Sequence, residues 1–420
     1  MRRKRVRTVG VALGAATAVG AVGVLARAAR EIPAAFGGDP TKGVSGALLS
    51  GSPRYRDGVF HNDVEPESGP QSGPEGGAGT VLREMLFGKQ LRRPSKPIPL
   101  VRDVSADAPA SEELAVTWFG HSTALVEIEG TRLLLDPVWS KRCSPSQSAG
   151  PRRIHEPPVA LDELPPIDAV VISHDHYDHL DMHSIVDLSH NQDARFLVPL
   201  GVGAHLERWG VSRDRIDELD WEGSVEIRGI RLVATSAQHF SGRRFSNNGT
   251  LWASWAILGA RHRVFYSGDS GYFDGFAETG DRYGPFDLSL VQIGAYSDHW
   301  RSIHMTPEEG VSTHLDVNRR RAGLAAGTGT DGAVGEVHDV HDGQGGDEGD
   351  GDGRDARGEG LFVPVHWGTF VLGLHDWSEP VERLCLDADA RGVRVAVPRP
   401  GERIEVSRPP KLDHWWRSVV

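Results

Sequence analysis

Cysteine is scarce in this sequence, since Cys143 and Cys385 are the only two among 420 residues. Two thiols form at most one bridge, so the chain has no disulfide framework and its cysteines do not identify a redox compartment. An excess of basic residues is also absent, because the formal net charge is −12. An acidic body has no electrostatic reason to bind nucleic acid, so we expect no nucleic-acid partner.

Long apolar runs are confined to the N-terminus. Residues 1–30 carry seven basic side chains and no acidic one, and positions 9–26 form an apolar stretch of 18 residues. As a helix, this stretch would span roughly 27 Å, close to the ~30 Å hydrocarbon core of a bilayer. We predict a membrane anchor or an export signal here, with a soluble amphiphilic tail as the alternative. The flanking positive charges predict membrane association and an extracytoplasmic body.

Composition divides the rest of the chain. Residues 31–110 are rich in glycine and proline and are predicted to be linker and irregular structure, followed by one folded domain over 111–405 and a C-terminal tail over 406–420. Positions 321–359 interrupt that domain with a glycine-rich, acidic stretch, which we interpret as a disordered insertion in a surface loop. A calcium-binding repeat is the alternative, but only one imperfect copy is present.

One hexapeptide, His174-Asp175-His176-Tyr177-Asp178-His179, follows the apolar run 167–172, which is predicted to be a buried strand. Three imidazoles and two carboxylates at a strand end are hard to explain by packing. Their spacing lets His174 and His176 serve one metal ion, and Asp178 and His179 a second. Such ligands suit zinc and other divalent transition metals. A surface-exposed polar loop is the alternative interpretation.

Similar residues follow other predicted strands. His239, Asp269 and His366 each come within five residues after a short apolar run, and His304 precedes a predicted helix with Thr306 as its N-cap and Pro307 at its first position. Strands that alternate with helices indicate a layered α/β architecture. For each of these residues alone, a hydrogen-bonded polar side chain at a strand end is the simpler interpretation.

In this order, the motifs resemble the metallo-β-lactamase-fold hydrolases, in the branch of N-acyl-phosphatidylethanolamine-hydrolysing phospholipase D and its bacterial relatives. The hexapeptide specifies the superfamily. The branch is indicated by the segments Gly268-Asp269-Ser270-Gly271-Tyr272 and His366-Trp367-Gly368-Thr369-Phe370. The segments Trp118-Phe119-Gly120-His121-Ser122-Thr123 and Asp136-Pro137-Val138-Trp139-Ser140 also carry the resemblance. The resemblance implies a four-layer αββα sandwich preceded by the N-terminal hydrophobic segment.

The resemblance also implies a site with two divalent metal ions, zinc first and manganese or iron as alternatives. His174, His176 and His239 would hold one ion; Asp178, His179 and His366 would hold the other; Asp269 would bridge them. His121 and Asp136 are expected to orient ligands or contact substrate. His304 is a candidate for substrate contact or proton donation, and His375 is a weaker candidate for substrate contact.

The expected activity is metal-dependent hydrolysis. Two cations about 3.5–4 Å apart can generate a bridging hydroxide at neutral pH, which Asp178 would orient. The branch implies a phosphodiesterase of phospholipase D type that acts on a phospholipid or another amphiphile. Hydrolysis of a lactone, ester or β-lactam is the alternative on the same fold, and a membrane-tethered metal-binding interaction protein is the alternative of another class. The sequence does not determine the oligomeric state.

Overall fold

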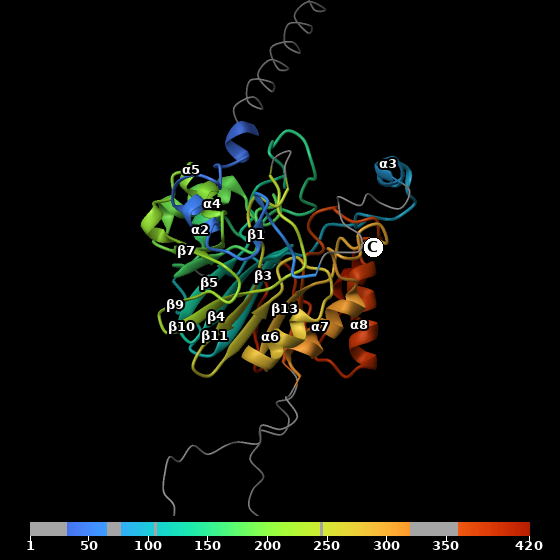
Figure 1. Ribbon diagram of the computed structural model, residues 1–420. Helices are drawn as coiled ribbons and strands as arrows, with labels where there is room; N and C mark the ends of the chain where they lie inside the picture. Colours follow the sequence, from blue (N-terminus) through green and yellow to red (C-terminus); the bar gives the residue numbers. More distant parts are fainter. Residues whose placement is uncertain (1–31, 65–76, 105–106, 244–246, 320–359) are drawn as a thin grey trace, which may run out of the picture.

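The computed structural model describes residues 32–64, 77–104, 107–243, 247–319 and 360–420. Two stacked β-sheets form its centre (Figure 1). The first sheet has seven strands in the spatial order β15-β3-β4-β5-β6-β7-β8. Their bounds are β3 Leu114–Gly120, β4 Thr123–Ile128, β5 Thr131–Leu135, β6 Ala169–Val171, β7 Arg195–Pro199, β8 Ile216–Leu219 and β15 Arg403–Glu405.

The second sheet has six strands in the order β14-β13-β12-β11-β10-β9. Their bounds are β9 Ser224–Ile227, β10 Ile230–Thr235, β11 Ser254–Leu258, β12 Arg263–Tyr266, β13 Leu288–Gln292 and β14 Leu361–Val365. In each sheet antiparallel hairpins are followed by parallel strands, from β5 to β8 and from β12 to β14. The parallel strands require crossover connections, which contain most of the helices.

Alternating side chains of the first sheet enter two different cores. Leu133 and Leu135 of β5 pack in the core between the two sheets, whereas Leu134 packs in the outer core. The outer core is covered by α4 (Met182–Asn191), which contributes Ile185 and Leu188, and by α5 (Gly203–Arg208), which contributes Leu206. Both faces of this sheet are therefore buried, which explains why β6 and the last four residues of β7 are apolar without interruption.

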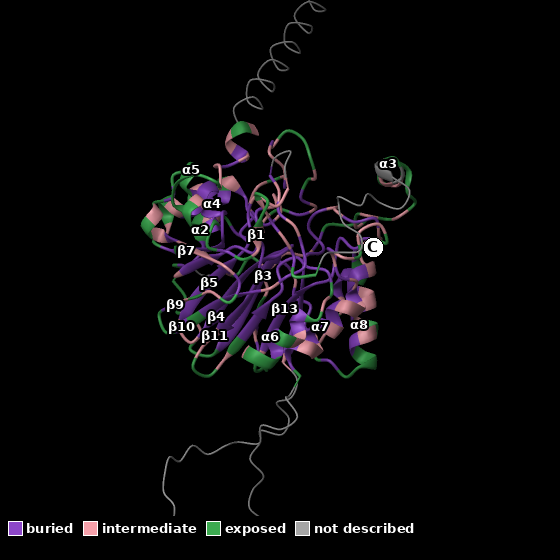
Figure 2. Cartoon of the chain, in the orientation of Figure 1, coloured by how far each residue is buried: buried purple, intermediate pink, exposed green. Residues whose placement is uncertain are grey.

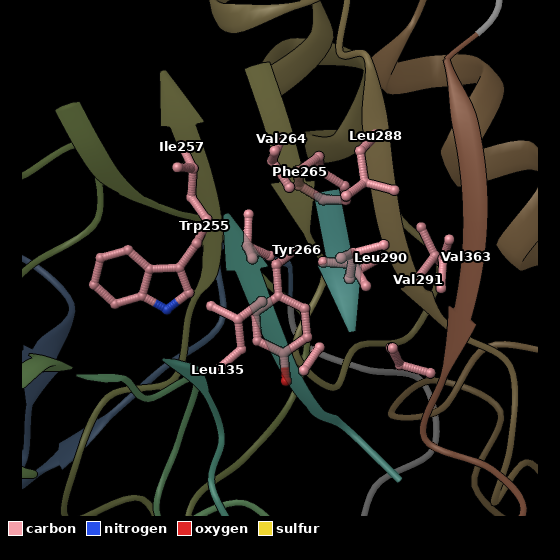
Figure 3. Packing of buried hydrophobic residues seen from close by; sticks show 14 of the residues in the cluster. Leu135, Trp255, Ile257, Val264, Phe265, Tyr266, Leu288, Leu290, Val291 and Val363 are labelled. Atoms are coloured by element: carbon pink, nitrogen blue, oxygen red, sulfur yellow. The ribbon is translucent and has the colours of Figure 1, made fainter. Parts of the chain in front are cut away.

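Three helices cover the second sheet: α6 (Gly275–Tyr283), α7 (Pro307–Val317) and α8 (Glu379–Ala390). Phe276, Val311 and Leu384 of these helices join the same core as the strands. Figure 2 shows buried strands between helices whose outer faces are intermediate or exposed. Figure 3 shows the packing of β12, β13 and β14 side chains with Leu135 of the first sheet. The architecture is the four-layer αββα sandwich that the sequence predicted.

Part of the range predicted to be linker packs on the domain instead. It contains α2 (Gly43–Leu49), β1 (Tyr55–Arg56), β2 (Val59–Phe60) and α3 (Gly77–Phe87). Phe60 of β2 is fully buried. The indole Nε1 of Trp209 donates a hydrogen bond to Ala34 O at 2.8 Å. Glycine and proline content reports local backbone preference, so it did not reveal these long-range contacts.

The C-terminal tail also packs on the domain. A short 3₁₀ helix, η3 (Trp415–Ser418), buries Trp415 and Trp416, and the Trp416 indole donates to Glu382 of α8 at 2.7 Å. The predicted anchor at 1–30 and the core of the predicted insertion at 321–359 lie outside the described residues. Within the described ranges, no helix has the length and apolar character needed to span a bilayer.

Candidate metal centre

The site lies where strands of both sheets end on one edge of the sandwich. In the first sheet, His121 follows β3, Asp136 follows β5, and the hexapeptide 174–179 comes shortly after β6. In the second sheet, His239, Asp269 and His366 follow β10, β12 and β14. Chain direction explains the convergence, because β3, β5 and β6 run the same way in one sheet, as β10, β12 and β14 do in the other.

Three of these residues turn the backbone sharply. His121, Asp136 and His366 have positive φ values of 54°, 38° and 61°. A non-glycine residue in this region costs roughly 1–2 kcal/mol, so neighbouring contacts must hold it. One such contact joins two of the turns directly, because the His366 N–H donates to His121 O at 2.9 Å.

One group of ligand atoms consists of imidazole nitrogens only. His174 Nε2 lies 2.8 Å from His176 Nδ1, which lies 3.3 Å from His239 Nε2. In a tetrahedral zinc site with bonds of 2.0–2.1 Å, ligand atoms are separated by about 3.3–3.4 Å. These three nitrogens therefore have nearly the spacing of ligands to a single ion.

A second group combines nitrogen and oxygen. Asp178 Oδ2 lies 3.2 Å from His366 Nε2, 3.6 Å from His179 Nε2 and 2.9 Å from His121 Nε2. The structure thus brings His121 among the predicted ligands, where it shares the Asp178 carboxylate with His179 and His366.

Asp269 faces both groups. Its Oδ2 lies 2.9 Å from His366 Nε2 and 3.1 Å from His179 Nε2, and it is 3.9 Å from both His174 Nε2 and His239 Nε2. A single carboxylate oxygen thus lies between the two nitrogen sets. This is the position that a ligand shared by two cations needs.

Unpartnered atoms indicate that the cluster is built to hold cations. Asp269 Oδ1 is buried and makes no hydrogen bond, and His179 Nε2 faces Asp269 Oδ2 at 3.1 Å without hydrogen-bond geometry, although both side chains are almost fully enclosed. Buried polar atoms normally have partners, because their desolvation is otherwise uncompensated. Nitrogen and carboxylate donors at these spacings fit two divalent transition-metal ions.

Burial and charge act differently on the two groups. Burial lowers the pKa of His174 and His239 well below 6.5, so both imidazoles are neutral and offer a lone pair. Burial also acts against the charged form of His366, but Asp269 and Asp178 outweigh it and raise its pKa to about 9. The positive charge of His179 holds the pKa of Asp178 and of Asp269 well below 3.8 despite burial.

Asp136 orients a ligand without belonging to either group. Its Oδ2 accepts from His179 Nδ1 at 2.6 Å and from Ser173 Oγ at 2.5 Å, and its Oδ1 accepts from the Ser173 N–H at 2.7 Å. The Tyr266 hydroxyl, which projects from β12 in Figure 3, donates to the same carboxylate. Because Nδ1 of His179 is engaged, its Nε2 is left to face Asp269 and Asp178.

His304 lies at the edge of the cluster. Its Nδ1 is 3.9 Å from Asp269 Oδ2 and accepts a 2.9 Å hydrogen bond from the Gln292 side-chain amide. Burial lowers the pKa of His304 to about 3, so the imidazole is neutral at pH 7. With Nδ1 acting as the acceptor, the ring proton resides on Nε2.

His375 is not part of the cluster. Its ring stacks on Tyr296 with centroids 4.6 Å apart, and its Nε2 accepts from the Ala295 N–H at 3.1 Å. It shares a small cavity of about 20 Å³ with His121 and His366. The structure therefore places His375 at this cavity and outside the ligand groups, where its contacts are those of a packed side chain.

Three supporting residues were not identified from the sequence. Asn62 accepts from the His239 N–H at 3.0 Å and donates to His239 O at 2.9 Å. Gln292 holds His304, and Asp175 of the hexapeptide is buried against His205 at 3.3 Å. Gln292 is the last residue of β13, close to where the ligands follow the ends of other strands. Its position at a predicted strand end could therefore have identified it. Asn62 had no such signal, because it lies 177 residues from its partner.

Fold and site together define a metal-dependent hydrolase of the metallo-β-lactamase superfamily, and the chain belongs to it. Residues 131–325 match the Beta-lactamase superfamily domain. A solved metallo hydrolase from Ignicoccus hospitalis aligns with a TM-score of 0.47 and 19% identity, over 69% of this chain and 97% of that one. The family and the donor set indicate divalent metal binding.

Within this superfamily, the chain is a homologue of N-acyl-phosphatidylethanolamine-hydrolyzing phospholipase D. It is 38% identical to phospholipase D 1 of that name from Caenorhabditis elegans, over 69% of this chain and 74% of the relative. An uncharacterized protein of Mycobacterium tuberculosis is 48% identical over 96% of this chain and 98% of its own length. The second match includes most of the N-terminal region, so that region is not peculiar to this chain.

Proposed function

We propose that this protein is a phosphodiesterase of phospholipase D type that acts on N-acyl-phosphatidylethanolamine-like lipids with two zinc ions. The observation that carries the proposal is the position of Asp269 Oδ2 between the two ligand groups, 2.9 Å from His366 Nε2 and 3.9 Å from His239 Nε2. Similarity to the worm phospholipase D supports the substrate class.

The bound metals would supply Lewis acidity toward phosphoryl oxygens and would lower the pKa of water toward 7. The protein's own groups supply orientation and a proton. Asp178 Oδ2 accepts from His121 Nε2 at 2.9 Å and stays ionised, so it can accept a hydrogen bond from an attacking water. Neutral His304, held by Gln292 at Nδ1, presents its Nε2–H as a donor to a departing alkoxide.

Apolar side chains beside the Asp178 group suit a lipid substrate. Val138, Cys143 and Phe370 form a small buried cluster against which Tyr177 and Leu372 pack. Phe370 lies edge-on to the His121 ring with centroids 5.2 Å apart. Tyr177 and Leu372 are partly exposed, so they offer apolar surface for acyl chains next to the polar centre.

We also propose that the protein associates with membranes through residues 1–30 and that the body is extracytoplasmic. A group of exposed apolar side chains supports a membrane contact: Met85, Phe87 and Leu91 are 45%, 78% and 73% exposed. They lie on or just after α3, which stands apart from the sheets in Figure 1. Fractionating cells that express the full chain or a chain lacking residues 1–30 tests the anchor, which requires the shortened chain to leave the membrane fraction.

A substrate panel tests the activity. Purified protein is offered N-acyl-phosphatidylethanolamine in mixed micelles, a soluble lactone and a β-lactam, and products are identified by mass spectrometry. The proposal predicts an N-acylethanolamine and phosphatidate as products. His176→Ala should abolish this reaction, whereas His183→Ala, an exposed histidine on α4, should leave it unchanged. Turnover of the lactone or β-lactam with the lipid left intact would replace this function with the alternative hydrolase activity.

A further inference from the structure

A cavity of about 730 Å³ lies apart from the metal ligands. Its lining comes from residues 93–102 and from the connection 139–163 between β5 and β6, and it contains none of the residues of the metal clusters. The volume is within the ~300–1,000 Å³ range of small-molecule sites. The cavity is therefore large enough for a ligand of its own.

The lining is basic although the protein is acidic. Arg93, Arg102, Lys141 and Arg152 are exposed around the cavity, in a chain whose formal net charge is −12. Among the described residues, none of these four cations has an ion-pair partner. Arg102 alone has a side-chain hydrogen bond, to Pro158 O at 2.9 Å. Unpaired cations around one cavity attract an anion.

Two acidic residues also line the cavity, but one is already engaged. Glu163 accepts from the Ala160 N–H at 2.9 Å through Oε2, and Glu156 is exposed. A fifth cation, Arg153, is buried and donates to Val138 O at 2.6 Å. Positive charge therefore exceeds negative charge in the lining.

One wall of the cavity is apolar. Trp139, Ile154 and Val159 contribute to it, and the Trp139 indole is fixed by a 2.9 Å hydrogen bond to Val159 O. An aromatic and aliphatic wall next to several cations matches a ligand with an apolar body and an anionic head.

The cavity wall is connected to the metal centre at two points. Ser140, next to Trp139, donates through its N–H and Oγ to Asp181 at 3.0 and 2.8 Å, two residues beyond His179. His155 Nε2 lies 3.0 Å from Thr369 Oγ1, three residues beyond His366. One ligand loop thus contacts the lining residue His155, and the other contacts Ser140, which lies between the lining residues Trp139 and Lys141.

We propose that this cavity binds the phosphate-monoester head of an anionic amphiphile, as a ligand site separate from the metal centre. A phosphate monoester carries nearly two negative charges and three acceptor oxygens, which suits several Arg and Lys side chains that line one cavity. The assignment does not depend on the proposed activity. If that activity holds, phosphatidate is both its lipid product and a ligand of the required chemistry.

Calorimetric titration tests the site with the full chain. The probes are a short-chain phosphatidate below its micelle concentration, a phosphatidylcholine of equal chain length, and inorganic phosphate. We expect saturable binding of phosphatidate, weaker binding of inorganic phosphate, and none of phosphatidylcholine. Phosphatidylcholine that binds as tightly as phosphatidate would overturn the anionic recognition, and inorganic phosphate that binds as tightly would overturn the role of the apolar wall.

Charge variants localise the binding. Lys141→Ala/Arg152→Ala should weaken phosphatidate binding about ten-fold or more, because charge-assisted hydrogen bonds are lost. The control variant Arg208→Ala/Lys411→Ala removes the same charge from exposed positions outside the cavity and should leave phosphatidate binding unchanged.

The charge-conserving variant Lys141→Arg/Arg152→Lys should retain phosphatidate binding. His176→Ala should also retain it, which separates this site from the metal centre. Unchanged binding in Lys141→Ala/Arg152→Ala, or binding lost only in His176→Ala, would overturn the proposal.

Discussion

At the scale of single residues, Asp136 illustrates how a buried carboxylate acts on a site through its neighbour. Among the described metal ligands, it contacts His179, whose Nδ1 donates to its carboxylate at 2.6 Å. Two further hydrogen bonds join the same carboxylate to Ser173. The Asp136 backbone has a positive φ of 38°. The sequence pointed to this residue only through a resemblance, because Asp-Pro after a strand is also an ordinary turn.

Asp136→Asn should lower metal affinity by about 10–100-fold, the usual effect of losing a partner that orients a metal-binding histidine. Competition with a chromogenic chelator measures this affinity. Asp168→Asn is the matched control, because Asp168 accepts from the Arg132 N–H at 2.8 Å outside the cluster. Wild-type affinity in Asp136→Asn would show that His179 needs no such partner.

His304→Gln should lower kcat for the lipid by about 10²–10⁴-fold, the range for a lost general acid. Metal content should stay at the wild-type level, because His304 Nδ1 is engaged by Gln292. Hydrolysis of bis(4-nitrophenyl) phosphate, whose leaving group needs little protonation, should be nearly unaffected. Equal loss on both substrates, or loss of metal, would contradict the role of proton donor.

At the scale of elements, strand ends were the most informative feature of the sequence. Each predicted ligand that followed an apolar run does follow a strand, and Thr306 caps α7 through a reciprocal pair of hydrogen bonds with Glu309. Local patterns such as caps and alternation can be predicted because they depend on neighbours in sequence. The Asn62–His239 contact could not be, since it joins segments that only the tertiary fold brings together.

An ion-pair network between α7 and α8 should make stability depend on pH. Arg383 lies 2.7 Å from Glu308 Oε2 and 3.2 Å from Glu379 Oε1. Burial would raise the pKa of Glu308, but the hydrogen bonds from Arg383 outweigh it and hold that pKa below 4.5. Because the folded pKa is the lower one, the stabilisation is present above about pH 4.5 and is lost as the pH falls through the folded pKa.

Arg383→Met should therefore lower the free energy of unfolding at pH 7, and its difference from wild type should shrink as the pH falls below about 4.5. Denaturant unfolding at several pH values measures this difference. The effect should be small, because the Arg383 and Glu308 side chains are 35% and 40% exposed and solvent screens the pair. Arg391→Met, which removes a surface pair with Asp387, is the control. A difference in the free energy of unfolding that grows as the pH falls would contradict this expectation.

At the scale of the whole molecule, two sheets built from distant parts of the chain place their strand ends at one edge. His121 and His366 are 245 positions apart in sequence, yet their ring centroids are 4.1 Å apart. The fold class and the clustering of the candidate ligands were accessible from sequence because the motifs are short and ordered. The packing of the N-terminal and C-terminal segments was not, because composition carries no information about tertiary contacts.

We propose that two metal ions held by this cluster make the protein a lipid phosphodiesterase. The most direct measurement adds zinc stepwise to chelator-treated protein while phosphatidate release from N-acyl-phosphatidylethanolamine is followed. Two ligand groups that share Asp269 predict that activity reaches its plateau at two zinc ions per chain. Full activity without added metal, or two tightly bound ions with no lipid hydrolysis, would contradict the account.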